Sequence, residues 1–376
     1  MAGQVVIAPD KFKGSLTAAE AAEAISVGLE RGDPCTTTVL CPVADGGDGT
    51  LGTVLAAGFQ RIPVYAKGPT GQVVRTAYAR SGRTAVIEMA EICGLQRLSG
   101  GQRAPMTASS RGLGEVVAQA LDHGCRDIII GVGGSASTDG GAGFLAALGA
   151  TVRDGSGVRI DPTGRGIGAA ADLDLSALHP GISCATFTLA SDVDNPLYGP
   201  LGAAAVYAPQ KGATADEVTQ LDSGLRRWAE VVAREMRADH SGSPGAGAAG
   251  GVGFAALAVL GAQMRPGIDV IIDRIELDRH LQGARAVVTG EGSLDRQSLR
   301  GKAAVGVCRR ATRYGVPTFA VAGVSTLTSA QASDAGFADV YALSELEPDP
   351  ERSMSRAAEL LSDVAERLAR RLVACP

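Results

Sequence analysis

The sequence is poor in the residues on which several classes of enzyme depend. It holds only four histidines and seven cysteines among 376 residues, and no two cysteines form a C-x-x-C pair. Scattered cysteines in this number indicate reduced thiols rather than a disulfide framework. With histidines and cysteines both dispersed, a zinc site and a Ser-His-Asp triad are excluded as working hypotheses. Any chemistry has to depend on carboxylates, hydroxyls and lysines.

Long apolar runs and a strong charge of one sign are also missing. No apolar run reaches the ~18 residues of a membrane span. The N-terminus becomes charged at Asp10 and Lys11, before a signal-length apolar stretch develops. The net charge is −5, with no block of lysine and arginine. We therefore expect a soluble, cytoplasmic monomer or homodimer that acts on a small molecule and binds neither nucleic acid nor membrane.

Lysine is the scarcest charged residue, with five lysines against 30 arginines. Lysine is a compact point charge on a flexible stem, which suits the neutralisation of phosphate groups. Four of the five adjoin a glycine, and chance explains any single case as readily as a function does. These four are Lys13, Lys67, Lys211 and Lys302. Lys67 lies in an ordinary turn sequence, KGPTG.

Apolar strand patterns alternate with helix signals at both ends of the chain, which predicts a parallel sheet. The predicted strands there cover residues 5–8, 36–41, 285–289, 318–322 and 339–342. In the middle, residues 61–66, 73–80 and 84–89 read as hairpin strands. We expect an α/β protein of two domains. Residues 1–60 plus 283–376 form the parallel-sheet domain, and residues 61–282 form an inserted mixed α/β domain.

One glycine-rich segment, GVGGSASTDGGAG at 131–143, follows the apolar run Ile128–Ile130. A loop this rich in glycine suggests that something approaches its backbone closely, and a phosphate held by N–H groups is the first candidate. GVGGSA here and GAGAAG at 245–250 also match dinucleotide-binding patterns, so a nicotinamide-dependent oxidoreductase stays an alternative. The helix comes late after the first match, and no predicted strand precedes the second. A flexible linker or close helix packing also explains GAGAAG.

Acidic residues stand in pairs in the loops that follow predicted strands. The pairs are Asp45 with Asp48, Asp192 with Asp194, and Glu291 with Asp295, which flank Ser293. Asp48 alone could simply cap the helix that begins near Thr50. Paired acids beside glycines and lysines fit phosphoryl transfer, which needs oxygen ligands for Mg²⁺, cations on the phosphates and a carboxylate for the acceptor hydroxyl. Loops at the carboxyl ends of parallel strands are expected to share a cleft.

Several long motifs resemble the bacterial glycerate kinases that form 2-phosphoglycerate, the type I glycerate 2-kinase family. They are IAPDKFKGSLTAAEAAEAI, PVADGGDGT, GVGGSASTDGGAGFLAALG, SDVDNPLYGPLGAA, YAPQKGA, GAGAAGGVGFA and VVTGEGSLDRQSLRGKA. They occur in order from about Val5 to beyond Gly323. The resemblance implies phosphorylation of D-glycerate with ATP and Mg²⁺. It also implies that the domain built from both chain ends is flavodoxin-like.

Roles can be assigned to the loop residues as a hypothesis under that resemblance. The phosphate oxygens are bound by the glycine loop through Gly133, Gly134, Ser135, Ser137 and Thr138. Lys11 or Lys13, together with Lys302, neutralises the transferring group, and Asp45 and Asp48 hold Mg²⁺. Asp192, or next to it Asp194, orients the acceptor hydroxyl or takes its proton. Glycerate is positioned by Ser293, Asp295 and Gln297, with Glu291 beside them.

Other readings of the same residues stay open. The acceptor could be another small hydroxy acid, or the 3-hydroxyl of glycerate. A nucleotide sensor without catalysis is a further alternative, but binding alone would not need several carboxylates next to a polyphosphate.

Overall fold

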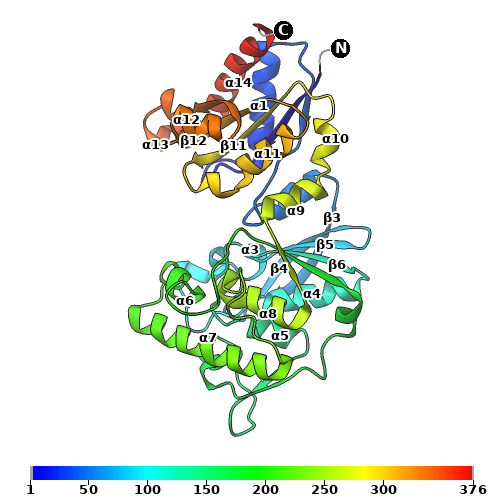
Figure 1. Cartoon of the computed structure of the whole chain (residues 1–376), viewed down its shortest axis with the longest axis vertical. Helices are drawn as coiled ribbons and strands as arrows, with labels where there is room; N and C mark the ends of the chain where they lie inside the picture. The colour runs from blue at the N-terminus through cyan, green and yellow to red at the C-terminus, as the bar shows by residue number, and fades with distance from the viewer. Residues whose placement is uncertain (1–2, 375–376) are drawn as a thin grey trace. The chain divides into compact units, whose positions relative to one another are not determined.

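The computed structural model describes residues 3–374, which form two compact units (Figure 1). Unit 1 consists of Met1–Asp45, Gly52–Gly58 and Pro266–Pro376, and unit 2 of Gly46–Leu51 and Phe59–Arg265. Unit 1 thus draws on both ends of the chain, and the predicted α/β class with one parallel and one mixed sheet is confirmed. That residues 1–60 plus 283–376 and residues 61–282 fold as independent domains stays a prediction.

Unit 1 is built on a five-stranded sheet of order β13-β12-β11-β1-β2, in which each neighbouring pair is parallel. Counted along unit 1 alone, this order is 2-1-3-4-5, the doubly wound arrangement of flavodoxin-like folds. The predicted flavodoxin-like architecture is therefore confirmed. The strands are β1 (Val5–Pro9), β2 (Thr38–Leu40), β11 (Ala286–Leu294), β12 (Thr318–Ser325) and β13 (Phe337–Ala342).

Helices cover the sheet of unit 1 because successive strand side chains point to opposite faces and both faces are apolar. Ile7 of β1 packs in one cluster with Leu361 of α14, and Ala320 of β12 packs in another with Ala304 of α11. The helices are α1 (Ala18–Gly32), α9 (Gly267–Arg274), α10 (Leu277–Leu281), α11 (Ala303–Thr312), α12 (Ser329–Asp334), α13 (Pro350–Ser355) and α14 (Ala357–Ala374), and α2 (Thr50–Ala56) begins in unit 2 and continues in unit 1.

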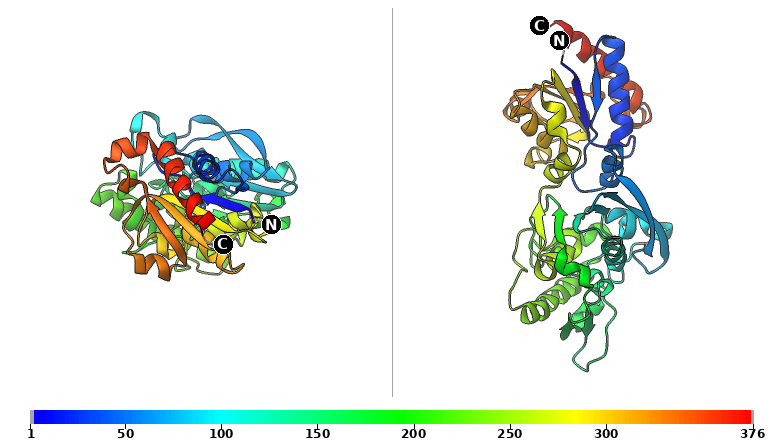
Figure 2. Two further views of the ribbon diagram at one scale, coloured as in Figure 1. Left: turned by 90° about the horizontal axis from the view of Figure 1, so that it is seen from above. Right: turned by 90° about the vertical axis from the view of Figure 1, so that its right-hand side faces the viewer.

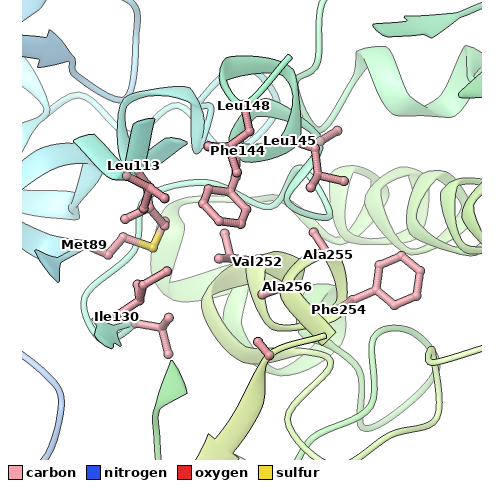
Figure 3. Close-up of a cluster of buried hydrophobic side chains, with 14 of the residues drawn as sticks. Met89, Leu113, Ile130, Phe144, Leu145, Leu148, Val252, Phe254, Ala255 and Ala256 are labelled. Carbon is pink, nitrogen blue, oxygen red and sulfur yellow. The ribbon is translucent and has the colours of Figure 1, made fainter. Parts of the chain in front are cut away.

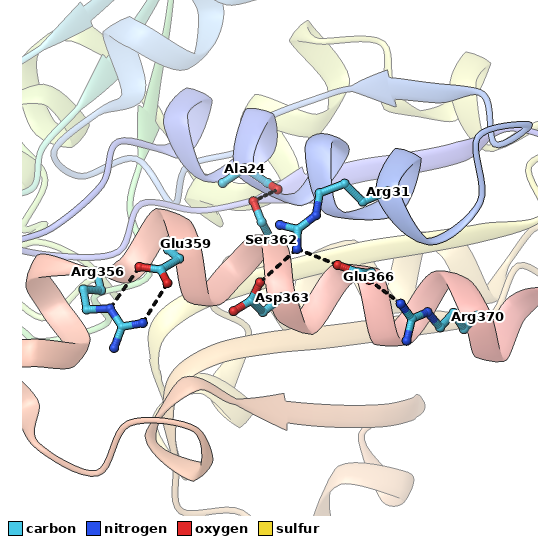
Figure 4. A network of polar contacts seen from close by, with 8 residues as sticks. All are labelled: Ala24, Arg31, Arg356, Glu359, Ser362, Asp363, Glu366 and Arg370. Atoms are coloured by element: carbon cyan, nitrogen blue, oxygen red, sulfur yellow. Dashed lines mark hydrogen bonds and ion pairs between the residues drawn. The ribbon is translucent and has the colours of Figure 1, made fainter.

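Helices α1 and α14, from opposite ends of the chain, lie side by side (Figures 1 and 2). The contact is backbone-close, because a Cβ on Gly28 would stand 2.1 Å from the carbonyl oxygen of Ser362. The Ser362 hydroxyl donates to the carbonyl of Ala24 at 2.7 Å, and Arg31 pairs with Glu366 at 2.6 Å (Figure 4). The apolar face of α14 is core packing, since Leu361, Val364 and Leu368 are buried in one apolar cluster with Ile25 of α1.

Unit 2 is built on a six-stranded mixed sheet of order β10-β9-β6-β5-β4-β3. β3, β4 and β5 run antiparallel as two hairpins, as predicted, and β5, β6, β9 and β10 are parallel. The strands are β3 (Gln60–Lys67), β4 (Val73–Ser81), β5 (Thr84–Glu88), β6 (Asp127–Gly131), β9 (Thr186–Ala190) and β10 (Gln263–Arg265), with a separate pair of β7 (Thr151–Arg153) and β8 (Asp172–Asp174).

The core of unit 2 joins helices from distant parts of the sequence. Leu113 of α4, Phe144 of α5 and Val252 of α8 are fully buried in one apolar cluster with Ile130 of β6 (Figure 3). The helices are α3 (Ala90–Cys93), α4 (Arg111–Asp122), α5 (Ala142–Ala147), α6 (Ala203–Tyr207), α7 (Ala215–Met236) and α8 (Val252–Leu260). None of the helices formed by residues 3–374 has the length and apolar character needed to cross a membrane.

Candidate functional site

The sheet of unit 1 has a topological switch point between β1 and β11, where the strand order reverses. Ligands of open α/β sheets bind beyond the carboxyl ends of the strands at such a point. Asp10 and Lys11 directly follow β1, and Glu291 and Ser293 lie in the carboxyl-terminal part of strand β11. The two strand ends are tied together, since the amide of Asp10 donates to the carbonyl of Gly290 at 2.8 Å.

Asp10 is a buried carboxylate at this switch point, only 7% exposed. Its side chain accepts the amide hydrogen of Lys11 at 2.7 Å. Burial raises the pKa of Asp10 to about 7, and the charges of Asp45 and Glu291 add to the shift while Lys11 opposes it. Three carboxyl groups therefore repel one another here, an arrangement that a bound cation would relieve.

Glu291 is a second buried acid of the cluster, 8% exposed, and its Oε1 has no hydrogen-bond partner. Burial raises its pKa, as do Asp45 and Asp295, whereas Ser298 and Lys302 lower it. Asp295 is engaged differently, since its Oδ1 accepts the amide hydrogens of Gln297 at 2.7 Å and of Ser298 at 3.2 Å. Asp295 thus shapes the turn that follows β11.

The remaining predicted residues of unit 1 surround this cluster with different exposures. Ser293, Gln297 and Lys13 are exposed, and Lys11 and Lys302 are partly buried. Lys302 immediately precedes α11, and its charge acts on Glu291. The structure thus brings Asp45, Glu291, Asp295, Lys11 and Lys302 into one electrostatic cluster. Sequence reasoning missed Asp10, although it lies in the quoted PDKFKG motif.

The glycine loop of unit 2, residues 131–143, owes its composition largely to packing. A Cβ on any of its six glycines would meet a heavy atom within 3.0 Å. On Gly133 the neighbour is the Cα of Gly47 at 2.6 Å, and on Gly134, whose φ is +70°, it is the Oδ1 of Asp48 at 2.8 Å. The loop that contains Asp48 therefore packs directly against the glycine loop.

Glu88, at the end of β5, anchors that second loop and was not predicted. Its carboxylate accepts the amide hydrogens of Gly49 at 3.0 Å and Leu51 at 2.7 Å, at the start of α2. The side chain is 3% exposed, and burial raises its pKa to about 7 against the effect of these two hydrogen bonds. The sequence signal that could have identified Glu88 is its position as a charged residue at the end of the apolar run of β5.

The hydroxyls predicted to bind phosphate have different environments. Ser135 is nearly buried, and its Oγ accepts a hydrogen bond from Lys211. Ser137 and Thr138 are fully buried, and their hydroxyl oxygens have no hydrogen-bond partner. Gly133 is partly exposed and Gly134 is exposed, so this part of the loop offers backbone to solvent.

Asp139, also within the glycine loop, holds the loop in place through hydrogen bonds to its carboxylate. Its carboxylate accepts from the amide and hydroxyl of Ser110 at 2.7 and 2.8 Å, and from the amide of Gly141 at 3.1 Å. Burial raises the pKa of Asp139, and these hydrogen bonds oppose the shift. The loop is therefore a rigid, internally hydrogen-bonded structure.

Asp192 and Asp194 follow β9, and both side chains are exposed. The loop is held by the Ser191 hydroxyl, which accepts the amide hydrogen of Val193 at 3.2 Å. Asn195, next along the chain, accepts from the hydroxyl of Tyr207 at 2.7 Å. The two acids are therefore presented to solvent by an ordered loop at the carboxyl end of a parallel strand.

The GAGAAG segment at 245–250 packs against the glycine loop. The amide of Gly140 donates to the carbonyl of Gly250 at 2.9 Å, and a Cβ on Gly250 would stand 2.1 Å from the carbonyl oxygen of Ser137. No strand immediately precedes the segment among the described residues. Close packing is thus the explanation that the structure supports for GAGAAG.

Cation binding can be judged from the oxygen donors. Across residues 3–374, no group of three or more His, Cys, Asp or Glu side chains has an arrangement that holds a metal by itself. The buried acids of unit 1 still fit a hard cation, because Glu291 Oε1 lacks a partner and the charge of Asp45 raises the pKa of both Asp10 and Glu291. Asp45 belongs to unit 1 and Asp48 to unit 2, and their predicted pairing on Mg²⁺ stays a prediction.

Comparison with known proteins agrees with this site chemistry. The model of the "Glycerate kinase family" matches residues 5–373. The chain is 42% identical over 86% of its length to the glycerate 2-kinase of Escherichia coli K12, covering 86% of that protein, and 37% identical over 97% of both chains to a glycerate kinase of Bacillus cereus. A solved structure from Salmonella typhimurium LT2, provisionally named glycerate kinase 2, superposes with a TM-score of 0.87 at 40% identity, covering 100% of this chain and 99% of that one. The chain belongs to the glycerate kinase family.

Proposed function

We propose that this enzyme transfers the γ-phosphoryl group of ATP to D-glycerate, giving 2-phosphoglycerate and ADP. The observation that carries the proposal is the acidic cluster at the switch point of unit 1, where Asp10, Asp45 and Glu291 lie beside Lys11 and Lys302. Cations on the phosphates and carboxylates for a metal are the groups that phosphoryl transfer requires. The enzyme would act on this small molecule in the cytoplasm, as a monomer or homodimer.

The transfer itself is a displacement at phosphorus. The 2-hydroxyl oxygen of glycerate forms a bond to the γ-phosphorus as the bond to the bridging oxygen of ADP breaks, in line with it. We assign Asp192 to accept the hydroxyl proton, with Asp194 as the second candidate, because both carboxylates are exposed at a strand end. Positioning of glycerate is assigned to Ser293, Asp295, Gln297 and Glu291.

Charge on the triphosphate is the main obstacle to attack, and several groups are assigned to offset it. Lys11, Lys13 and Lys302 supply ammonium groups, and the exposed backbone at Gly134, next to Gly133, supplies an amide donor. Of the hydroxyls assigned to phosphate binding, Ser135 lies next to that exposed backbone, whereas Ser137 and Thr138 are fully buried.

Magnesium fits the acidic cluster on the donor chemistry. Asp45 would hold the ion, with Asp10 and Glu291 as further carboxylates and Asp48 as the predicted partner from unit 2. When bound with ATP, the ion neutralises charge on the phosphate oxygens.

The test is incubation of the protein with Mg-ATP and D-glycerate, with the phosphorylated isomer identified by ³¹P NMR. The expected product is 2-phosphoglycerate. Formation of 3-phosphoglycerate would show that the acceptor is the 3-hydroxyl of glycerate and not the 2-hydroxyl. Turnover only with other hydroxy acids would show that the substrate is not glycerate. ATP binding without any turnover would favour the nucleotide sensor and refute the proposal.

A further inference from the structure

Lys211 is a buried cation that lies under the glycine loop of unit 2. It ends a short 3-10 turn, Pro209–Lys211, and is 2% exposed. Its Nζ donates to the Oγ of Ser135 at 2.9 Å and to the carbonyl oxygen of Ser137 at 2.5 Å. Both acceptors are neutral oxygens, and the carboxylate of Asp139 in the same loop supplies the nearby negative charge that opposes the cost of burying the ammonium group.

The hydrogen bond to Ser135 fixes what that hydroxyl can do. An ammonium group has three donors and no acceptor, so the Oγ of Ser135 must act as the acceptor in this contact. The hydrogen of the Ser135 hydroxyl is then directed elsewhere. Ser135 is 7% exposed and follows the exposed Gly134, so a ligand at the loop can supply an acceptor for this hydrogen.

The backbone of the loop does not need Lys211 to hold its shape at Ser135. Ser135 bridges Gly94, the amide of Ala136 donates to the carbonyl of Cys93 at 3.1 Å, and the amide of Leu95 donates to the carbonyl of Gly134 at 2.9 Å. The lysine thus adds charge and hydroxyl orientation to a loop that is already fixed. The hydroxyl of Ser137, by contrast, is not among its partners and stays unsatisfied.

We infer that Lys211 is a positioning residue that makes the Ser135 hydroxyl a hydrogen-bond donor to a phosphate oxygen of the nucleotide. The inference rests on the proposed function in so far as the ligand is ATP. Hydrogen bonds polarise one another in a low-dielectric interior, so a cation on the oxygen strengthens the donation from its hydrogen. Burial lowers the pKa of Lys211 to about 8, while Asp139 and Cys93 raise it, so the group is mostly charged at neutral pH.

The decisive experiment is a double-mutant cycle of Lys211→Met and Ser135→Ala, with Lys67→Met as control. Lys67 is an exposed lysine of β3 in the same unit and should leave all values unchanged. The Kd for Mg-ADP by calorimetry and the KM for ATP are measured for each variant. Each single substitution should raise the Kd about tenfold. The Kd of the double variant should be no higher than that of the single variant that binds less tightly. Circular dichroism verifies folding.

Wild-type KM and Kd in a folded K211M would overturn the inference, as would losses that multiply in the double variant. If K211M does not fold, the pH profile decides. The KM of the wild type for ATP should rise above pH ~8 as the ammonium loses its proton, and S135A should lack this rise. The same rise in S135A overturns the inference.

Failure of the proposed function is distinguishable from failure of this inference. If the wild type binds Mg-ADP but does not phosphorylate glycerate, the proposed function fails, whereas coupled losses in the Kd cycle still support the role of Lys211. If glycerate is phosphorylated normally by K211M, only the inference fails.

Discussion

Two glutamates occupy equivalent places in the two units and differ in how they are satisfied. Glu88 ends β5 in unit 2 and Glu291 lies near the end of β11 in unit 1, and both are buried with a raised pKa. Glu88 accepts two backbone amide hydrogens, whereas Glu291 keeps an oxygen without a partner. A buried carboxylate whose hydrogen bonds are supplied by the protein has a structural role. A buried carboxylate with an oxygen that lacks a hydrogen-bond partner is available for a ligand.

The same contrast extends to the regions around them. The switch point of unit 1 brings together carboxylates that repel one another, so a bound cation would be stabilised there. The glycine loop of unit 2 has exposed backbone and a buried ammonium group beside it. Both would stabilise a bound anion. Position at the carboxyl ends of parallel strands is common to both. The two regions differ in that the buried acid of the glycine loop, Asp139, has an ammonium group near it, whereas the buried acids of unit 1 lie near one another.

The largest effect is expected from the exposed acids of unit 2. Asp192→Asn should lower kcat by ~10²–10⁴-fold because the acceptor hydroxyl loses its base, with little change in folding. Steady-state kinetics with D-glycerate measure it, and Asp194→Asn is the matched control, with a smaller loss. Near-normal turnover of D192N would remove Asp192 from that role and leave the chemistry to the buried acids.

The buried ammonium of unit 2 should appear in the pH dependence of stability. The pKa of Lys211 is lowered from 10.5 to about 8, so the folded state binds fewer protons than the unfolded state between these values. The free energy of unfolding should therefore rise with pH from about 8 to 10.5, by up to ~3 kcal/mol relative to K211M. Urea unfolding of both proteins at several pH values measures the difference. Parallel curves would mean that folding does not lower the pKa of Lys211.

The comparison of the two glutamates is tested by the same substitution in each. Glu291→Gln should raise the Mg²⁺ concentration for half-maximal activity about tenfold, since a cation loses a carboxylate. Glu88→Gln should leave that concentration unchanged, because its carboxylate faces backbone amides. An equal shift in both variants would contradict the distinction. A rise confined to the KM for glycerate in E291Q would assign Glu291 to the substrate.

The smallest effect concerns the packing of the two loops in unit 2. Gly134→Ala should cost ~1 kcal/mol for its left-handed φ of +70°, and more for the Asp48 Oδ1 that a Cβ would meet at 2.8 Å. Gly82→Ala is the matched control, since Gly82 has a φ of +55° and nothing within 4 Å of its Cβ. Thermal unfolding compares the two. Equal losses would show that the loops are not in close contact.

Much of the fold could be predicted because it depends on local patterns. The hairpins of β3, β4 and β5 and the parallel strands of unit 1 follow from apolar runs and turn residues. β11 extends to Leu294, beyond the predicted residues 285–289, because its pairing with β12 continues to Ser325. Register with a distant strand leaves no mark on the local sequence.

The site could be predicted only in part, because burial decides the chemistry of its members. Asp45, Glu291 and Lys302 were predicted from motif and spacing, and their roles stay predictions. Lys211 carries the same signal as the exposed Lys67, an adjoining glycine, and only the packing of unit 2 separates them. Asp10 and Glu88 end apolar strands, and nothing local reveals that one meets other acids and the other two backbone amides.

The pairing of α1 with α14 has a consequence for biosynthesis. A ribosome releases the first helix of unit 1 early, but α14, the helix that covers its glycine face, is made only after the whole of unit 2. Unit 2, apart from its short segment at 46–51, is continuous in sequence and can complete its core while translation proceeds. The apolar face of α1 therefore stays uncovered by its partner helix until α14 has emerged from the ribosome.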